Sequence, residues 1–134
     1  MKALRIFSLA LISGAVFLTS CDKDDDDVST TEKLQKNWAV DSVAVKTTSG
    51  AGSATLVYNG TAADYYDFRT NDSLYFKLST EQDVLPYRIL SDSWLLVDGD
   101  SAQILSLTGS RMQLYTKDIS SPGNYTETTA WFRR

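Results

Sequence analysis

The chain has 134 residues, of which 13 are Lys or Arg and 17 are Asp or Glu, and its formal net charge is −4. It contains no His and one Cys, which excludes a Ser-His-Asp triad, imidazole metal ligands and a disulfide within the chain. The chain lacks a cluster of Lys and Arg, and binding to nucleic acid needs such a cluster to displace counterions from the phosphates.

The first twenty residues have the pattern of a secretory signal peptide. Lys2 and Arg5 give a positively charged start, and residues 6–18 form an apolar run without charge. This run has the length of a signal's hydrophobic region, and it is shorter than the roughly 20 apolar residues that a membrane-spanning helix needs. We therefore predict that residues 1–20 are removed from the exported protein.

The four residues Leu18-Thr19-Ser20-Cys21 resemble the lipobox of bacterial lipoproteins, in which an aliphatic residue and two small residues precede an obligatory cysteine. The resemblance implies that signal peptidase recognises Leu18, Thr19 and Ser20 and cleaves after Ser20. Cys21 would then be the site of lipid attachment, carrying palmitate-type acyl chains. Two or more such chains hold a protein firmly on a membrane.

An acidic segment, residues 22–27, follows the cysteine directly. Its like charges predict an extended, solvated spacer, so that residues 21–29 form a lipidated and flexible tether. Asp22, Lys23, Asp24 and Asp25 also resemble the export signal that sends lipoproteins to the surface of one group of Gram-negative bacteria. We expect a lipid anchor in the outer membrane that faces the cell exterior. The alternative is a protein that faces the periplasm, because in other bacteria an acid after the cysteine means retention at the inner membrane.

Residues 30–134 have the length of one domain and are rich in Thr, Ser, Val, Leu and aromatic residues, a composition that favours strands. The hydroxyl, acidic and basic residues of Ser29–Lys36 predict one short helix. After it, alternating apolar residues and turn signals predict nine strands: Trp38–Val45, Ala54–Tyr58, Tyr65–Arg69, Ser73–Leu78, Val84–Leu90, Trp94–Val97, Ala102–Leu107, Arg111–Thr116 and Glu127–Arg133.

The connections between these strands are short, apart from two polar segments that we expect to be loops, Lys46–Ser53 and Lys117–Tyr125. Sequential hairpins form a meander, and a meander of about eight strands closes into an up-and-down antiparallel β-barrel, which removes exposed sheet edges. The predicted fold class is therefore all-β, a small barrel with one short N-terminal helix. A two-sheet β-sandwich is the alternative.

Several segments resemble the lipocalin-like domains of small surface lipoproteins. They are Trp38-Ala39-Val40 after the short helix, Tyr66-Asp67-Phe68 before a polar turn, Tyr87-Arg88-Ile89, and residues 103–108 followed by Met112-Gln113-Leu114. The resemblance covers nearly all of residues 30–133. It implies a calyx-like barrel that takes a small apolar or amphipathic ligand.

The aromatic residues are the candidates for lining such a cavity, because Trp and Tyr combine flat apolar faces with a polar tip. We expect inward positions for Trp38, Tyr66, Phe68, Phe76, Tyr87 and Trp94. The alternative is that these side chains fill the barrel. The protein would then be a non-catalytic accessory or protein-interaction module, acting on an unidentified protein partner through its outer face or its two long loops.

No catalytic group emerges from the sequence. A carboxylate pair could act as acid and base, but we expect Asp64, Asp67, Asp98 and Asp100 to lie in turns or on outward faces and to be solvated. The chain has neither a phosphate-binding Gly-rich loop nor the ligand spacing of a calcium loop. We therefore predict a protein that is not an enzyme and has no cofactor and no metal site.

The lipid anchor can be tested by metabolic labelling with radioactive palmitate. Wild-type protein should incorporate label, and the variant Cys21→Ala should incorporate none, because it lacks the thiol that accepts the diacylglyceryl group. The variant should also keep its signal peptide, which mass spectrometry of the purified chain would detect. Equal labelling of the two proteins would contradict the assignment of Cys21.

Overall fold

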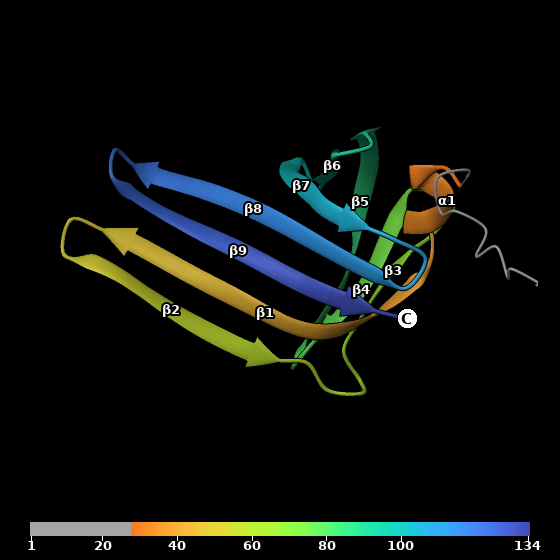
Figure 1. Ribbon diagram of the computed structural model, residues 1–134, viewed down its shortest axis with the longest axis horizontal. Coiled ribbons are helices and arrows are strands. Elements are labelled where there is room, and N and C mark those ends of the chain that lie inside the picture. Colours follow the sequence, from red (N-terminus) through yellow and green to blue (C-terminus); the bar gives the residue numbers. More distant parts are fainter. Residues whose placement is uncertain (1–27) are drawn as a thin grey trace, which may run out of the picture.

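The computed structural model describes residues 28–134, so the predicted signal peptide, Cys21 and export signal lie outside the described residues. One short helix precedes nine antiparallel strands (Figure 1). Their bounds are α1 Thr30–Leu34, β1 Asn37–Ser49, β2 Gly52–Asn59, β3 Tyr65–Phe68, β4 Ser73–Leu78, β5 Glu81–Ser91, β6 Trp94–Val97, β7 Asp100–Leu107, β8 Arg111–Ser121 and β9 Asn124–Arg133.

Eight of the strands close into a barrel. Strands β3 to β9 pair in chain order, and β1 closes the ring by pairing with β3 on one side and with β9 on the other. Each pair of neighbours is antiparallel. The predicted up-and-down barrel is therefore confirmed, and the alternative of a sandwich of two separate sheets is wrong.

The ninth strand, β2, belongs to a sheet that projects beyond the barrel. The order in this sheet is β2-β1-β9-β8, and Figure 1 shows the four strands extending together from one end of the barrel. We call the projecting part, residues 43–58 and 116–128, the arm. One face of the arm continues the barrel interior, because the inward residue Val43 stands opposite Tyr58 on β2 and Ala130 on β9.

Two predicted loops are strands of the arm. The segment Lys46–Ser53 contains the end of β1, a turn at Gly50–Ala51 and the start of β2, and Lys117–Tyr125 contains the ends of β8 and β9 around a turn at Pro122–Gly123. Unbroken pairing runs along β1 and β2 as far as Ser49 opposite Gly52. The prediction was wrong because both faces of this sheet meet solvent, so its residues lack the apolar alternation that marks a strand with one buried face.

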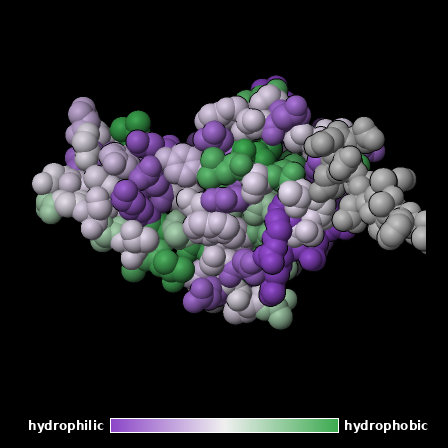
Figure 2. Space-filling model, viewed as in Figure 1, coloured by the Kyte–Doolittle hydropathy of each residue, from purple (hydrophilic) through white to green (hydrophobic). Residues whose placement is uncertain are grey.

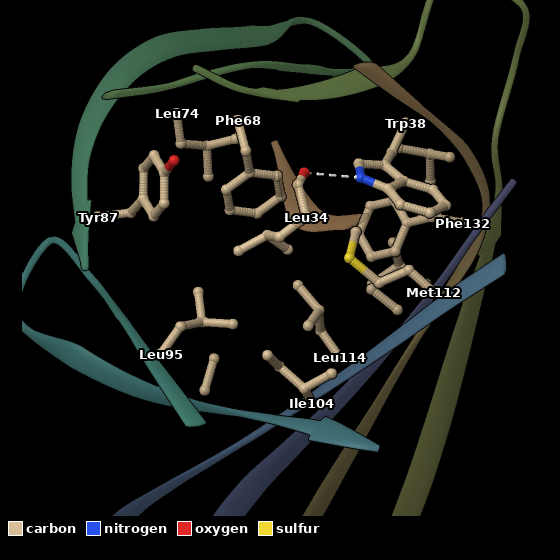
Figure 3. Close-up of a cluster of buried hydrophobic side chains, with 14 residues drawn as sticks. Leu34, Trp38, Phe68, Leu74, Tyr87, Leu95, Ile104, Met112, Leu114 and Phe132 are labelled. Atoms are coloured by element: carbon tan, nitrogen blue, oxygen red, sulfur yellow. Dashed lines mark hydrogen bonds between the residues drawn. The ribbon is translucent and has the colours of Figure 1, made fainter. Parts of the chain in front are cut away.

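Helix α1 lies across the opposite end of the barrel, which we call the closed end. Ser29 caps the helix in a capping box with Glu32. Leu34 is fully buried, and its carbonyl oxygen accepts a hydrogen bond of 3.0 Å from the indole Nε1–H of Trp38. Figure 3 shows Leu34 in the middle of the ring of core side chains. The helix thus replaces solvent at this end of the barrel with a packed apolar layer.

Strand β1 changes its neighbour at a β-bulge. Residues Asn37–Ala39 pair with β3, the register then shifts between Val40 and Ser42, and from Ser42 onward β1 pairs with β2. Gly60 lies against this bulge, where its N–H donates a 2.9 Å hydrogen bond to the carbonyl of Asp41. A Cβ atom at position 60 would overlap the carbonyl oxygen of Val40.

Gly60→Ala should therefore lower the free energy of unfolding by about 1–3 kcal/mol, since the methyl group would push apart two backbone segments of the barrel wall. The measurement is urea unfolding followed by tryptophan fluorescence. Gly50→Ala is the matched control, because no atom lies within 4 Å of the added Cβ there, and its stability should stay within about 0.5 kcal/mol of wild type. Equal stability of all three proteins would show that the contact at Gly60 does not constrain the fold.

Candidate ligand-binding site

A cavity of about 190 Å³ lies inside the barrel, between the packed closed end and the arm. Its wall is mostly apolar and comes from strands β3, β4 and β6 to β9. The lining residues are Tyr66, Phe68, Leu74, Val97, Asp100, Ala102, Leu114, Thr116, Thr128, Ala130 and Phe132. We call this cavity the barrel pocket.

Aromatic rings form one side of the barrel pocket. The ring of Tyr66 lies 4.9 Å from that of Phe132 and 5.5 Å from that of Phe76, centroid to centroid, and both pairs are tilted. Such tilted contacts are favourable because the ring edges face the π clouds. Of the aromatic residues expected to face a cavity, Tyr66 and Phe68 are among those around the barrel pocket, whereas Phe76 pairs with Tyr66 across β3 and β4 and is not among them.

The environment of Tyr66 keeps its phenol neutral. Burial raises the pKa of the hydroxyl, and the negative charge of Glu81 raises it further. Both effects disfavour the phenolate. Tyr66 is therefore a neutral wall residue with a polar tip, and it cannot serve as an anionic base at neutral pH.

Trp38 and Tyr87 lie deeper, on the side of the closed end. The Tyr87 hydroxyl donates a 2.7 Å hydrogen bond to the carbonyl of Arg69 and accepts one of 3.1 Å from the Nε2 amide of Gln35. Its ring meets Phe68 edge-on at 5.1 Å (Figure 3). Burial raises the pKa of this phenol as well. Both side chains are fully engaged in packing, so they support the floor of the barrel pocket and do not line it.

Trp94 is on the outside of the barrel, with 43% of its surface exposed. The prediction of an inward position is wrong for this residue. A register shift lies between Ile89 and Ser91 on the neighbouring strand, so that Trp94 pairs with Ser91 while Leu95 pairs with Ile89. Leu95 is fully buried and takes the interior place. The alternation of residues within β6 does not reveal a bulge on the neighbouring strand β5, so the sequence did not show which face of the sheet Trp94 occupies.

The space in the barrel pocket comes from small residues that the sequence analysis did not select. Ala102 and Ala130 occupy interior positions on β7 and β9, each two residues before a large buried side chain, Ile104 and Phe132. The short alanine side chains leave the half of the barrel toward the arm unfilled, while Ile104 and Phe132 pack the half toward α1. The signal that could have found them is a small residue in an inward register, and this register becomes visible only when the strands are paired.

Asp100 is the acidic residue of the lining, and neither Lys nor Arg is among the residues that line the barrel pocket. Asp100 starts β7 and pairs with Val97 at the end of β6. This position is at the end of the barrel from which the arm projects, which we call the mouth. The barrel pocket therefore has an apolar interior and an acidic group at its opening.

Asp64 differs most from its expected environment. It is 1% exposed and not solvated. Its carboxylate accepts hydrogen bonds of 2.7 Å from the Tyr58 hydroxyl, 2.7 Å and 2.8 Å from the backbone N–H and hydroxyl of Thr61, and 2.7 Å from the N–H of Ser79. The Thr61 N–H and then the Tyr58 hydroxyl hold the pKa of Asp64 well below its usual range.

Asp64 is therefore a structural anion. Thr61 and Tyr58 belong to the end of β2 and the loop after it, and Ser79 belongs to the turn between β4 and β5, where it has a φ of 58°. The carboxylate joins these two connections at the mouth. Asp67, by contrast, forms a surface ion pair with Arg69, and Asp98 and Asp100 are exposed as expected.

Residues 28–134 contain no group of three acidic, His or Cys side chains that could hold a metal ion. Within the same residues, no helix is long and apolar enough to cross a membrane.

The role of Asp64 predicts a specific pH dependence. A carboxyl whose pKa falls on folding stabilises the protein above its ordinary value of 3.8, and this contribution is lost as the pH falls through the folded-state value. Asp64→Asn should therefore lower the melting temperature by several degrees at pH 7, and the difference from wild type should shrink below pH 3.8. The control Asp98→Asn, at an exposed turn residue with a φ of 52°, should melt like wild type at pH 7. A constant difference across the pH range would contradict the assignment.

No protein-family model matches the chain, and no curated protein matches it. Among solved structures, the chain resembles a deswapped triple mutant of bovine odorant binding protein, with 16% sequence identity over 76% of this chain and 74% of that chain and a TM-score of 0.43.

Proposed function

We propose that this protein is a lipid-anchored bacterial surface protein whose barrel binds a small apolar or amphipathic molecule, without catalysing a reaction. The observation that carries the binding proposal is the barrel pocket, an apolar space that the chain leaves open although the other half of the same barrel is packed. Protein interiors are normally close-packed, and an unfilled space loses favourable contacts. A ligand would restore them.

The volume limits the size of the ligand. A site for a drug-sized molecule has roughly 300–1,000 Å³, and a cavity of about 150 Å³ lined by apolar side chains takes benzene. A space of about 190 Å³ therefore matches one aromatic ring or a short alkyl chain. A larger molecule would reach out of the mouth along the inner face of the arm, where Val45 and Leu56 pair side by side.

The anchor proposal rests on the lipobox, Leu18-Thr19-Ser20-Cys21, and on the acidic residues after it. The described chain begins beside α1 at the closed end of the barrel, as Figure 1 shows. A tether at Cys21 would therefore join the closed end. The mouth is at the other end, where a ligand can enter from the solvent.

A second candidate function, protein interaction, is favoured by the arm. Leu56, Val57 and Ile119 expose 77%, 62% and 66% of their surfaces, and Figure 2 shows hydrophobic atoms over β2 and beside the end of β8. Val57 and Ile119 are on the outer face of the arm and Leu56 is on the inner face. In this alternative, the arm would contact a partner and the barrel would serve as its support.

Filling the barrel pocket tests the binding proposal. The protein is anchored in lipid nanodiscs, and its affinity for 2-phenylethanol is measured from the methyl NMR signal of Ala102, with empty nanodiscs correcting for partition into lipid. Ala130→Leu should weaken binding by at least ten-fold, because the larger side chain occupies the space that the phenyl ring needs.

Ala44→Leu is the matched control, because it makes the same change on the opposite face of the sheet, between the inward residues Val43 and Val45. It should bind like wild type. Native mass spectrometry of gently extracted protein gives a second readout, since a co-purifying small molecule should be present in wild type and absent from Ala130→Leu. If 2-phenylethanol binds equally to all three proteins, the barrel pocket is not the site.

A further inference from the structure

We infer that the barrel pocket selects a cationic ligand, namely a protonated amine joined to a small apolar body. This inference rests on the proposed function and names the chemical class of its ligand. The apolar body would occupy the barrel pocket, and the ammonium group would lie at the mouth, where β5, β7 and β8 each carry carboxylates on the inward face. The observations that carry it are the pocket lining, the register of the strands at the mouth and the position of the basic residues.

Strand pairing places the carboxylates at the mouth. Asp100, which lines the barrel pocket, stands opposite Val97, another lining residue. On β5, Asp83 stands opposite Phe76. Because paired residues point to the same face of a sheet, Asp83 shares the inward face with Phe76, which packs against the core. The starts of β5 and β7 thus each contribute an acid to the rim.

Two further acids extend this charge. Glu81 stands opposite Leu78 at the start of β5, and its charge raises the pKa of Tyr66 in the pocket wall, second to burial. The field of this carboxylate therefore reaches the wall of the barrel pocket. Asp118 follows the lining residue Thr116 by two positions on β8, so it continues the same face into the arm. Low-dielectric walls concentrate such a field at an opening.

The basic residues of the described chain are directed elsewhere. Lys46 pairs with Glu127 and Lys117 covers the ring of Tyr125, both on the outer face of the arm. Lys77 and Arg88 alternate with inward residues of β4 and β5 and so point outward. Arg69 pairs with Asp67, and Arg111 and Arg133 pair with Asp41. Lys33, Lys36 and Arg134 surround a groove beside α1 at the closed end. Within residues 28–134, no Lys or Arg therefore forms an ion pair with the acids at the mouth. One oxygen of Asp83 accepts a 2.7 Å hydrogen bond from the N–H of Val84, which leaves its other oxygen for a cation.

The wall chemistry also suits an ammonium ligand. Tyr66, Phe68 and Phe132 present aromatic rings to the space below the acids. Aromatic faces attract cations through their quadrupoles and pack against apolar groups. An anionic ligand of the same size would meet both the rim carboxylates and the negative faces of these rings. Among ligands of similar size, the barrel pocket should therefore bind a cation more tightly than a neutral molecule, and a neutral molecule more tightly than an anion.

Three ligands of similar shape test this order: 2-phenylethylammonium, 2-phenylethanol and 3-phenylpropionate. Each is titrated into the nanodisc-anchored protein, and the Ala102 methyl signal is followed at low salt. We expect the ammonium compound to bind about ten-fold more tightly than the alcohol, and the carboxylate to bind more weakly than the alcohol. Raising the salt to 0.5 M should weaken binding of the ammonium compound and leave the alcohol unchanged, because salt screens exposed charges.

Asp100→Asn should weaken binding of 2-phenylethylammonium by about three- to five-fold, and Asp83→Asn combined with it should weaken binding by about ten-fold. Both variants should weaken binding of 2-phenylethanol less than binding of the ammonium compound, because the alcohol carries no charge for the carboxylates to attract. Asp72→Asn is the matched control. It makes the same charge change in an exposed turn between β3 and β4, near α1, and asparagine tolerates the φ of 59° there.

The outcomes separate this inference from the proposed function. If the alcohol binds, Ala130→Leu abolishes that binding, and the ammonium compound binds no more tightly than the alcohol, then the barrel pocket stands and its preference for cations is overturned. Preferred binding of the carboxylate overturns it too. If none of the three compounds binds, the proposed function itself fails.

Discussion

Strand β1 holds the molecule together, because it pairs with three other strands, β3 and β9 in the barrel and β2 in the arm. Its first residues face β3 and its later residues face β2, and the bulge between Val40 and Ser42 makes the exchange possible. At the bulge, the pairing along one edge of β1 passes from β3 to β2. The backbone N–H and C=O groups between these two strands therefore need other hydrogen-bond partners. The N–H of Gly60 bonds the carbonyl of Asp41, the N–H of Val40 bonds the carbonyl of Asp64, and the Asp64 carboxylate binds the turn at Ser79. The mouth owes its shape to these contacts.

The barrel has two ends with different physical characters. At the closed end, Leu34 and Trp38 are fully buried, and a backbone carbonyl satisfies the indole N–H. At the mouth, two interior positions are alanine, and the space above them stays open. An eight-stranded barrel is narrow enough for side chains to fill it, so the choice of residue at a few inward positions decides whether it is solid or hollow. In this barrel the closed end is filled by side chains and the end toward the mouth contains the barrel pocket, so a filled core and a cavity occur together.

Alternation and turn residues were enough to predict the barrel and most of its strands, because in strands such as β4 the apolar residues Leu74, Phe76 and Leu78 alternate with Ser73, Tyr75 and Lys77. They were not enough for the arm, whose strands are exposed on both faces and carry Thr and Ser in place of an apolar stripe. They also failed for Trp94, since the bulge that turns it outward lies on another strand. Asp64 was misjudged for a related reason. Its four hydrogen-bond donors come from Tyr58, Thr61 and Ser79, and a donor fifteen residues away cannot be recognised before the fold is known.

The pairing of β1 with β9 also determines when the protein can fold. Ala39 stands opposite Arg133, so the first strand of the barrel needs the last one to complete its hydrogen bonds. Contacts between residues so far apart in sequence form slowly, because the chain loses the entropy of closing a long loop before the native contacts can stabilise it. Until residues 124–133 have emerged, both open edges of the growing sheet stay unpaired and available to other chains. A chain built in this way cannot close its barrel before its last strand has been made, and this delay suits the export that we propose for the protein.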